Sequence, residues 1–340
     1  MVGERRATLL LLVILCSLLV ALPNIETVRA TDDSWEILSN LPTGILGPGV
    51  AAVKGKIYVI GTSVNQEYDP VTDTWTPKRP MPTRRGQFAI AVYQNKIYVI
   101  GGGGNFGLEE VTGKNEVYDP LTDTWETKAP MPTARQFMDA NVVDGKIYVI
   151  GGSKPINYND PSYVPNINEV YDPETNKWST SIAPPVKVST YASAVYDNKI
   201  YVFSQYLTQI FDPQTYSWSN GTSMPNPGWG AAAGVTTGVF ATKRIYVLGG
   251  NPSFNFNQIY DPETDTWTMG ARMPTNRYGL GVAVVDDVIY AMGGPGAFGM
   301  VANERYIPIG YIPEFPSWTL FPILLISSLM ILIVRKKIGG

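Results

Sequence analysis

Three arginines stand at matching positions of a repeated pattern, and a cluster of arginines is suited to binding an acidic group. Arg85, Arg135 and Arg277 each lie three residues after the proline of a Met-Pro pair. Guanidinium groups pair with carboxylates and phosphates through two parallel hydrogen bonds. If the repeat closes into a ring, the three side chains converge towards its axis and form a binding site. The alternative is that each arginine bonds main-chain carbonyls of its own loop.

The composition excludes several kinds of chemistry. The 340 residues include no histidine, and the one cysteine, Cys16, lies in a segment that we expect to be removed. Without imidazole or thiolate we predict no zinc site, no Ser-His or Cys-His nucleophile and no disulfide, and we assign no cofactor and no catalytic residue. Only a metal with oxygen ligands, such as Ca²⁺, remains compatible with this composition. Residues 31–317 carry 20 basic and 27 acidic side chains, a net charge of −7 without a basic patch, so we expect no nucleic-acid partner.

Several short motifs are better explained by structure than by chemistry. Residues 102–107 and 294–299 match Gly-x-Gly-x-x-Gly, but each is followed by a predicted strand instead of the helix that a dinucleotide site needs. The acidic pairs 109–110 and 286–287 fall in a loop and a hairpin turn, where we expect solvated charge and not an acid/base pair. Asn220 begins an Asn-Gly-Thr sequence, a candidate glycosylation site.

Two long loops and one tryptophan are candidates for recognition. Residues 103–115 and 153–168 form extended loops, and the second contains Tyr158 and Tyr163. Such loops on a rigid scaffold often carry binding residues. Trp229 adds an aromatic side chain that we expect to be exposed, with packing inside its own repeat as the alternative.

One motif occurs five times, and such repetition indicates a structural role. The pattern Tyr-Asp-Pro-x-Thr-x-x-Trp, once with Phe for Tyr, starts at residues 68, 118, 171, 211 and 260. Proline fixes φ, and the Asp and Thr side chains can bond nearby main-chain N–H groups, which predicts a compact turn between two strands. The tryptophan offers a large apolar face to the neighbouring repeat.

A second motif recurs in step with the first. Apolar segments containing Ile-Tyr place this pair at residues 57, 97, 147, 200, 245 and 289, which gives periods of 40 to 53 residues. A typical unit has an apolar run at residues 137–143, an Asp-Gly turn and a second apolar run at 147–150, the pattern of a β-hairpin. Periods near 45 residues with several short strands indicate the blades of a propeller.

These motifs resemble the kelch repeat, in which a paired glycine follows an apolar strand and a Tyr and a Trp precede Met-Pro. The resemblance covers residues 33–308, and the fourth unit departs from it with Ser204-Gln205 in place of the glycines. It implies that the junction between consecutive blades lines the mouth of a central channel, where the arginines of kelch proteins often grip acidic ligands. Copper-radical oxidases of this fold need His and Cys, so no catalytic residue is carried over.

Counting the motifs predicts how the ring closes. Six Ile-Tyr strands stand against five internal tryptophan strands, and the missing tryptophan is Trp35 near the start of the chain. If Trp35 supplies the outer strand of the last blade, no sheet edge is left open at the seam. We therefore predict an all-β, six-bladed kelch propeller closed by the N-terminal strand.

The two ends of the chain read as export and anchor signals. A charged start, an apolar run and Val28-Arg29-Ala30 are typical of a signal peptide, with an uncleaved anchor as the alternative. Residues 313–316, Pro-Glu-Phe-Pro, resemble the PEF-type sorting signal of archaeal surface proteins, which implies that the following helix can be exchanged for another anchor. The expected order is signal peptide 1–30, propeller 31–308, linker 309–317, transmembrane helix 318–334 and basic cytoplasmic tail 335–340.

The preferred function is a membrane-anchored surface protein that binds a protein or a glycan through the face carrying the blade junctions and the long loops. One alternative is a surface enzyme acting on acidic sugars, because sialic-acid mutarotases share the kelch propeller and arginines suit a carboxylate. Another is a structural component of a surface layer. We expect the binding face to point away from the membrane.

Overall fold

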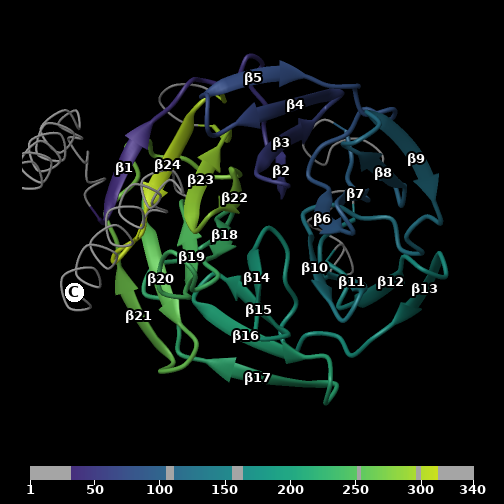
Figure 1. The fold of residues 1–340 in the computed structure, drawn as a ribbon. Helices are drawn as coiled ribbons and strands as arrows, with labels where there is room; N and C mark the ends of the chain where they lie inside the picture. Colours follow the sequence, from purple (N-terminus) through teal and green to yellow (C-terminus); the bar gives the residue numbers. More distant parts are fainter. Residues whose placement is uncertain (1–31, 105–110, 155–163, 251–253, 296–299, 313–340) are drawn as a thin grey trace, which may run out of the picture. The chain divides into compact units, whose positions relative to one another are not determined.

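The computed structural model describes residues 32–104, 111–154, 164–250, 254–295 and 300–312, which form 24 strands in six four-stranded antiparallel sheets. Figure 1 shows the sheets as blades around a common axis. Within these ranges no helix is long and apolar enough to cross a membrane. The predicted signal peptide and transmembrane helix lie outside the described residues, as do Tyr158 and Tyr163.

Each blade contains four strands, named a to d from the axis outwards. Blades 1 to 3 comprise β2 (Gly49–Val53), β3 (Lys56–Gly61), β4 (Val64–Asp69), β5 (Thr74–Pro77); β6 (Ala89–Tyr93), β7 (Lys96–Ile100), β8 (Asn115–Asp119), β9 (Thr124–Lys128); and β10 (Asp139–Val143), β11 (Lys146–Ile150), β12 (Asn168–Asp172), β13 (Lys177–Thr180). Blades 4 to 6 comprise β14 (Ala192–Tyr196), β15 (Lys199–Ser204), β16 (Leu207–Asp212), β17 (Ser217–Gly221); β18 (Ala232–Val235), β19 (Ile245–Leu248), β20 (Asn257–Asp261), β21 (Thr266–Met269); and β22 (Gly281–Val285), β23 (Val288–Met292), β24 (Asn303–Ile307), β1 (Ser34–Ile37).

In every blade except blade 5, the a and b strands form a tight hairpin because the two residues between them tolerate a left-handed backbone. Asp144 and Gly145 have φ angles of 48° and 73°, and Val143 pairs with Lys146. Two consecutive positive φ angles produce the type I′ turn that matches the twist of a hairpin. The predicted Asp-Gly turn is therefore confirmed, and the apolar b strands that follow such turns are buried.

The repeated Tyr-Asp-Pro corner joins strands c and d and also links neighbouring blades. In blade 2, Asp119 Oδ1 accepts a hydrogen bond from Leu121 N (2.9 Å), and the Tyr118 hydroxyl donates to Asp123 Oδ1 (2.7 Å). Trp125 packs on Tyr118 and on the core shared by blades 1 and 2, while its Nε1 donates to Arg79 O of blade 1 (3.0 Å). The predicted roles of this motif, a turn and an interblade wedge, are confirmed.

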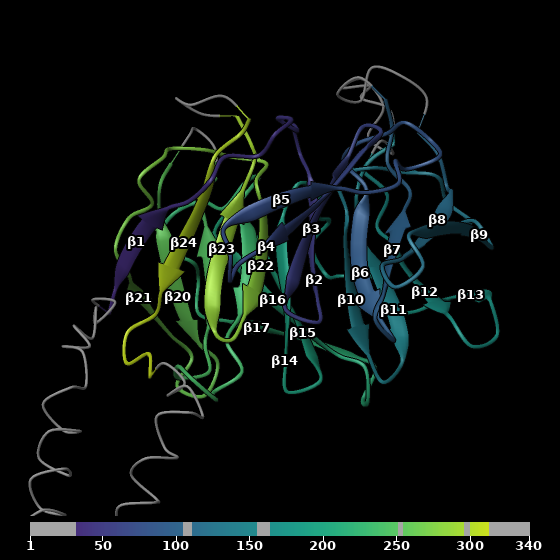
Figure 2. The ribbon, with the colours of Figure 1, turned by 45° about the horizontal axis from the view of Figure 1, so that its top comes forward.

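The ring closes as predicted, through a strand from the start of the chain. β1 pairs with β24, with Trp35 opposite Tyr306, and the two strands lie side by side in Figures 1 and 2. Trp35 Nε1 donates to Ala271 O of blade 5 (2.7 Å), and the Tyr306 hydroxyl donates to Asp33 Oδ1 (2.8 Å). Residues from opposite ends of the domain thus rebuild the corner that the other blades make locally.

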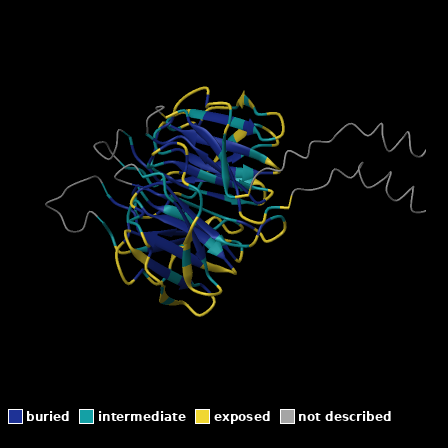
Figure 3. Cartoon of the chain, turned by 90° about the vertical axis from the view of Figure 1, so that its left-hand side faces the viewer, coloured by how far each residue is buried: buried dark blue, intermediate teal, exposed yellow. Residues whose placement is uncertain are grey.

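Strand alternation gives the propeller two different faces. The d–a junctions and b–c loops share one face, which we call the junction face, and the a–b and c–d turns share the other, the turn face. β1 begins and β24 ends at the turn face, and Ile312 N donates to Phe240 O in the a–b loop of blade 5 (2.7 Å). Figure 3 shows buried residues in the body of the blades and exposed ones in the outer strands and turns.

Candidate functional site

The three arginines predicted to bind a ligand are buried, and each forms an ion pair with a glutamate of its own blade. Arg135 is 0% exposed; its Nε donates to Gly151 O (2.6 Å) and one terminal nitrogen to Val149 O (2.9 Å). The other terminal nitrogen forms an ion pair with Glu169 and donates to Thr133 O. Burial lowers the pKa of Arg135, while the Glu169 carboxylate opposes that shift.

Arg85 and Arg277 repeat this arrangement in blades 2 and 6. They pair with Glu116 and Glu304 and donate to main-chain carbonyls of their own b strands. None of the three arginines lines the cavity at the mouth of the channel. The expectation that they face a ligand is therefore corrected in favour of the alternative, local bonding that fastens each d–a junction to strands b and c of its blade.

The other three blades show that arginine and glutamate occur as a set. Where the junction residue is Ile45, Val188 or Gly228, the c strand carries Gln66, Gln209 or Gln258 instead of glutamate. Each of these glutamine side chains accepts from the main-chain N–H of a junction residue and donates to the carbonyl of the same residue. At this position of the c strand, a carboxylate is present only in the blades whose junction arginine neutralises it. We conclude that these buried charges have a structural role.

A cavity of about 890 Å³ opens at the junction face, on the axis of the ring. All six blades contribute to its wall, and it reaches as deep as the second residue of each a strand: Val50, Ile90, Ala140, Ser193, Ala233 and Val282. Five of these six floor residues are apolar. The volume is within the range of small-ligand pockets, which is roughly 300–1,000 Å³.

A collar of main-chain hydrogen bonds makes the wall of this cavity rigid. Each junction holds one residue with φ between 51° and 69°: Gly47, Gln87, Phe137, Thr190, Gly230 and Gly279. Each of the last four donates its N–H to the carbonyl of the preceding collar residue at 2.7–2.9 Å. These four N–H groups are therefore bonded within the collar and are not available to a ligand.

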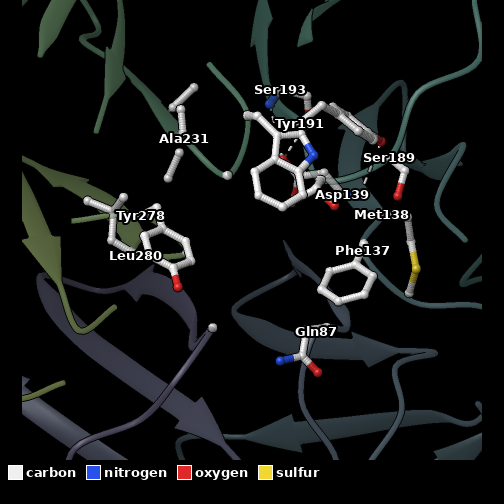
Figure 4. Close-up of a pocket in the computed structure, with 18 of the residues that line it drawn as sticks. Gln87, Phe137, Met138, Asp139, Ser189, Tyr191, Ser193, Ala231, Tyr278 and Leu280 are labelled. Atoms are coloured by element: carbon white, nitrogen blue, oxygen red, sulfur yellow. Dashed lines mark hydrogen bonds between the residues drawn. The ribbon is translucent and has the colours of Figure 1, made fainter. Parts of the chain in front are cut away.

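Asp139 places a carboxyl group on one wall of the cavity (Figure 4). Its Oδ2 accepts from Ser193 Oγ (2.7 Å) and Ser193 N (3.2 Å), and its Oδ1 accepts from Ala140 N (3.0 Å). The Tyr191 hydroxyl accepts from Asp139 N and donates to Ile150 O, which fixes this corner. The side chain is half-buried, and burial raises the pKa of Asp139 to about 6.

The raised pKa predicts a pH dependence of stability. Asp139 has a pKa of about 4 in an unfolded chain and about 6 here, so the folded state holds its proton more tightly. Its contribution is therefore fully present below pH 4 and is lost as pH rises to about 6, by up to about 3 kcal/mol. Comparing the unfolding midpoints of the wild type and Asp139→Asn from pH 4 to 8 measures this. A difference that does not change with pH would contradict the prediction.

Aromatic side chains surround the opening. Phe137 and Tyr278 lie on different sides of the cavity in Figure 4, and Trp229 also lines it. Trp229 is 44% exposed, which confirms the predicted exposure. Lys187, an exposed residue, adds a positive charge to the lining.

The remaining motifs have structural positions. Gly102 has a φ of 94°, and a Cβ there would lie 2.5 Å from Gly86 O, so the glycine pair serves close packing. Asp287 was expected to be solvated but is 1% exposed, and it accepts four main-chain N–H groups from residues 237–241, which corrects that expectation. Asn220 is exposed on β17. Across the described ranges, no group of three His, Cys, Asp or Glu side chains could hold a metal ion.

Asp139 was missed by the sequence reasoning, although a signal was present. The five residues that begin the other a strands are Gly49, Ala89, Ala192, Ala232 and Gly281. An acidic residue at a position that the repeat otherwise fills with glycine or alanine is a departure that packing does not require. The same comparison shows that the c strand has Glu in the three blades with a junction arginine and Gln in the other three. This difference identifies the glutamates as the partners of the arginines.

Comparisons with known proteins agree with this architecture. Residues 84–132 and 134–180 match the Kelch motif family. Kelch repeat and BTB domain-containing protein 12 of Homo sapiens is 32% identical over 94 residues, covering 23% of this chain and 15% of that protein. Beta-scruin of Limulus polyphemus is 33% identical over 94 residues, covering 24% of this chain and 10% of its own length.

A solved structure supports the fold over a larger part of the chain. The structure of YjhT superposes with a TM-score of 0.68 at 17% identity, covering 79% of this chain and 96% of that one. At this identity the likeness concerns the fold alone. Together with the repeated corners, glycine pairs and closing strand, these matches support a kelch-repeat propeller, with the Kelch motif itself matched over residues 84–132 and 134–180.

Proposed function

We propose that this kelch propeller is an exported, membrane-anchored binding protein that captures a partner protein at its junction face. The observation that carries the proposal is the cavity at that face, which combines a rigid main-chain collar with an exposed tryptophan. A preorganised pocket with an aromatic rim is the usual form of an interaction hot spot. The curated relatives are kelch-repeat proteins, a class generally used as interaction scaffolds.

The location of the chain ends supports the choice of face. The described chain begins and ends at the turn face, so an anchor following residue 317 would hold that face towards the membrane. The junction face would then point outwards. The alternative of an enzyme for acidic sugars relied on the arginines, which are paired with glutamates, and no observation favours the surface-layer alternative.

Substituting the rim tryptophan tests the proposal. In cells producing the full chain, Trp229→Ala should lower the affinity for the captured surface protein roughly 30-fold, because tryptophans at a binding pocket in the centre of an interface often act as hot spots. The protein should remain folded, with only a small fall in the unfolding midpoint, since Trp229 is 44% exposed. Removing residues 318–340 should move both the propeller and its binding activity into the medium.

Leu121→Ser is the matched control. Leu121 is 85% exposed at a c–d turn of the turn face, so its substitution should leave capture intact. Loss of capture in Leu121→Ser with full capture in Trp229→Ala would place binding on the opposite face. A glycan array on the same preparations would favour a sugar partner if it gave strong signals that Trp229→Ala abolishes.

A further inference from the structure

The described part of the propeller shows no lysine or arginine in an ion pair with the carboxyl group of Asp139. Its hydrogen bonds come from Ser193 and the main chain. The segments that separate the described ranges within residues 32–312 contain no lysine or arginine that could fill this role. A half-buried carboxylate that lines a cavity without a counter-ion is a candidate for binding a positive charge from outside.

Apart from the exposed Lys187, which adds one positive charge to the lining, the surroundings of Asp139 suit an ammonium group on an alkyl chain. Phe137, Trp229 and Tyr278 line the same cavity, and aromatic faces attract cations. The apolar floor residues can contact methylene groups, while the hydroxyls of Ser189 and Thr190 offer further acceptors. An anion would meet the Asp139 carboxylate, and the buried arginines are committed to their glutamates.

The hydrogen bonds already made by Asp139 favour ammonium over guanidinium. Oδ2 accepts two donors from Ser193 and Oδ1 accepts one from Ala140. One acceptor direction on Oδ1 therefore remains, which is too few for the two parallel bonds of an arginine fork. A lysine ammonium acts as a point donor and needs only one.

We propose that the cavity binds a lysine side chain presented by the partner protein, with Asp139 accepting from its ammonium group and the aromatic rim enclosing its alkyl chain. This assignment rests on the proposed function and adds the chemical class of the inserted group. The acidic propeller, with a net charge of −7 over residues 31–317, would also favour the approach of a basic surface.

Small probes test the assignment on the purified full chain. Saturation-transfer NMR should show Nα-acetyl-lysine methyl ester binding at least about tenfold more tightly than the norleucine analogue, which lacks the ammonium group. Asp139→Asn should remove this preference without changing norleucine binding. Asp144→Asn is the matched control, because it removes an exposed carboxylate from the other end of the same hairpin and should preserve the preference.

Several outcomes would overturn the assignment. These are equal binding of the lysine and norleucine probes, an unchanged preference in Asp139→Asn while its unfolding midpoint shows a folded protein, or tighter binding of the arginine analogue. Tighter binding of glucose or N-acetylglucosamine would instead indicate a sugar site. If Trp229→Ala abolishes partner capture while lysine and norleucine bind alike, the proposed function holds and only the lysine assignment fails.

Discussion

Replacing Arg135 by valine is expected to destabilise the propeller by about 3–5 kcal/mol, because it leaves a buried carboxylate without its counter-charge. Glu169 is 2% exposed and, among the described residues, would keep the Thr133 hydroxyl as its one side-chain donor. The carbonyls of Val149 and Gly151 would also each lose the guanidinium N–H that now donates to them. Thermal or urea unfolding of the variant measures the loss.

Blade 4 provides a design for the rescue. It has Val188 at the junction and Gln209 in the c strand, where the glutamine amide donates to Val186 O (3.2 Å) and accepts from Val186 N (2.9 Å). The double substitution Arg135→Val with Glu169→Gln copies this pair into blade 3. It should be more stable than Arg135→Val alone by about 2 kcal/mol, because a neutral glutamine needs no counter-charge. Such non-additive effects are expected for residues in direct contact.

The same variants separate the structural role of Arg135 from the ligand role that the sequence suggested. If the arginine holds the junction, Arg135→Val lowers the unfolding midpoint and the double variant recovers both stability and partner capture. If Arg135→Val unfolds like the wild type and loses capture, the arginine contacts the ligand and the structural assignment is wrong. Glu169→Gln alone completes the cycle and should also be destabilising, since it leaves Arg135 buried and unneutralised.

The architecture was predictable because its determinants are local and repeated. Asp119, Pro120 and Trp125 lie within seven residues of one another, and their hydrogen bonds build the same corner wherever the motif occurs. Hairpin turns such as Asp144-Gly145 are likewise specified by adjacent residues. Counting these units was enough to predict six blades and the role of Trp35.

The site was harder to predict because its contacts connect residues far apart in the sequence. Arg135 and Glu169 are 34 residues apart and meet only after strands b and c have paired. Three arginines at matching positions indicated a shared role, but the residue type alone could not distinguish an internal ion pair from a ligand contact. Asp139 begins strand a of blade 3, and Ser193 lies in strand a of blade 4. The two residues are 54 positions apart in the sequence and meet only when these blades pack side by side.

Deleting residues 32–42 should open the ring and have the largest effect of all, because these residues supply the whole outer strand of blade 6. The deletion removes four residue pairs between β1 and β24, the ion pair between Glu36 and Arg305, and the bonds from Trp35 to Ala271 and from Tyr306 to Asp33. The edge of β24 would then be exposed and able to pair with another chain. We expect aggregation, or an unfolding midpoint far below that of the wild type.

A matched pair of tryptophan variants separates the effect of opening the ring from the effect of losing side-chain packing. Trp267 in blade 5 packs against Tyr260 and donates to Thr222 O (2.9 Å), as Trp35 packs against Tyr306 and donates to Ala271 O (2.7 Å). Either substitution by alanine should cost about 3 kcal/mol in packing. Only Trp35→Ala should also produce oligomers in size-exclusion chromatography, because β1 has no hairpin partner to hold it, whereas β21 remains joined to β20 by a tight turn.

Strand complementation completes the test of closure. A peptide with the sequence of residues 31–42, added to the deletion variant, should restore a monomer and raise its unfolding midpoint, since it can add to the open edge of β24 as β1 does. The same peptide with alanine at the position of Trp35 should rescue poorly, because it lacks the side chain that reaches blade 5. A deletion variant that stays monomeric, with the midpoint of the wild type and no response to the peptide, would show that five complete blades and a three-stranded sixth are sufficient. In that case the seam contributes little to the ring. The main-chain collar and the interblade tryptophan corners would then be the features that keep the six blades together.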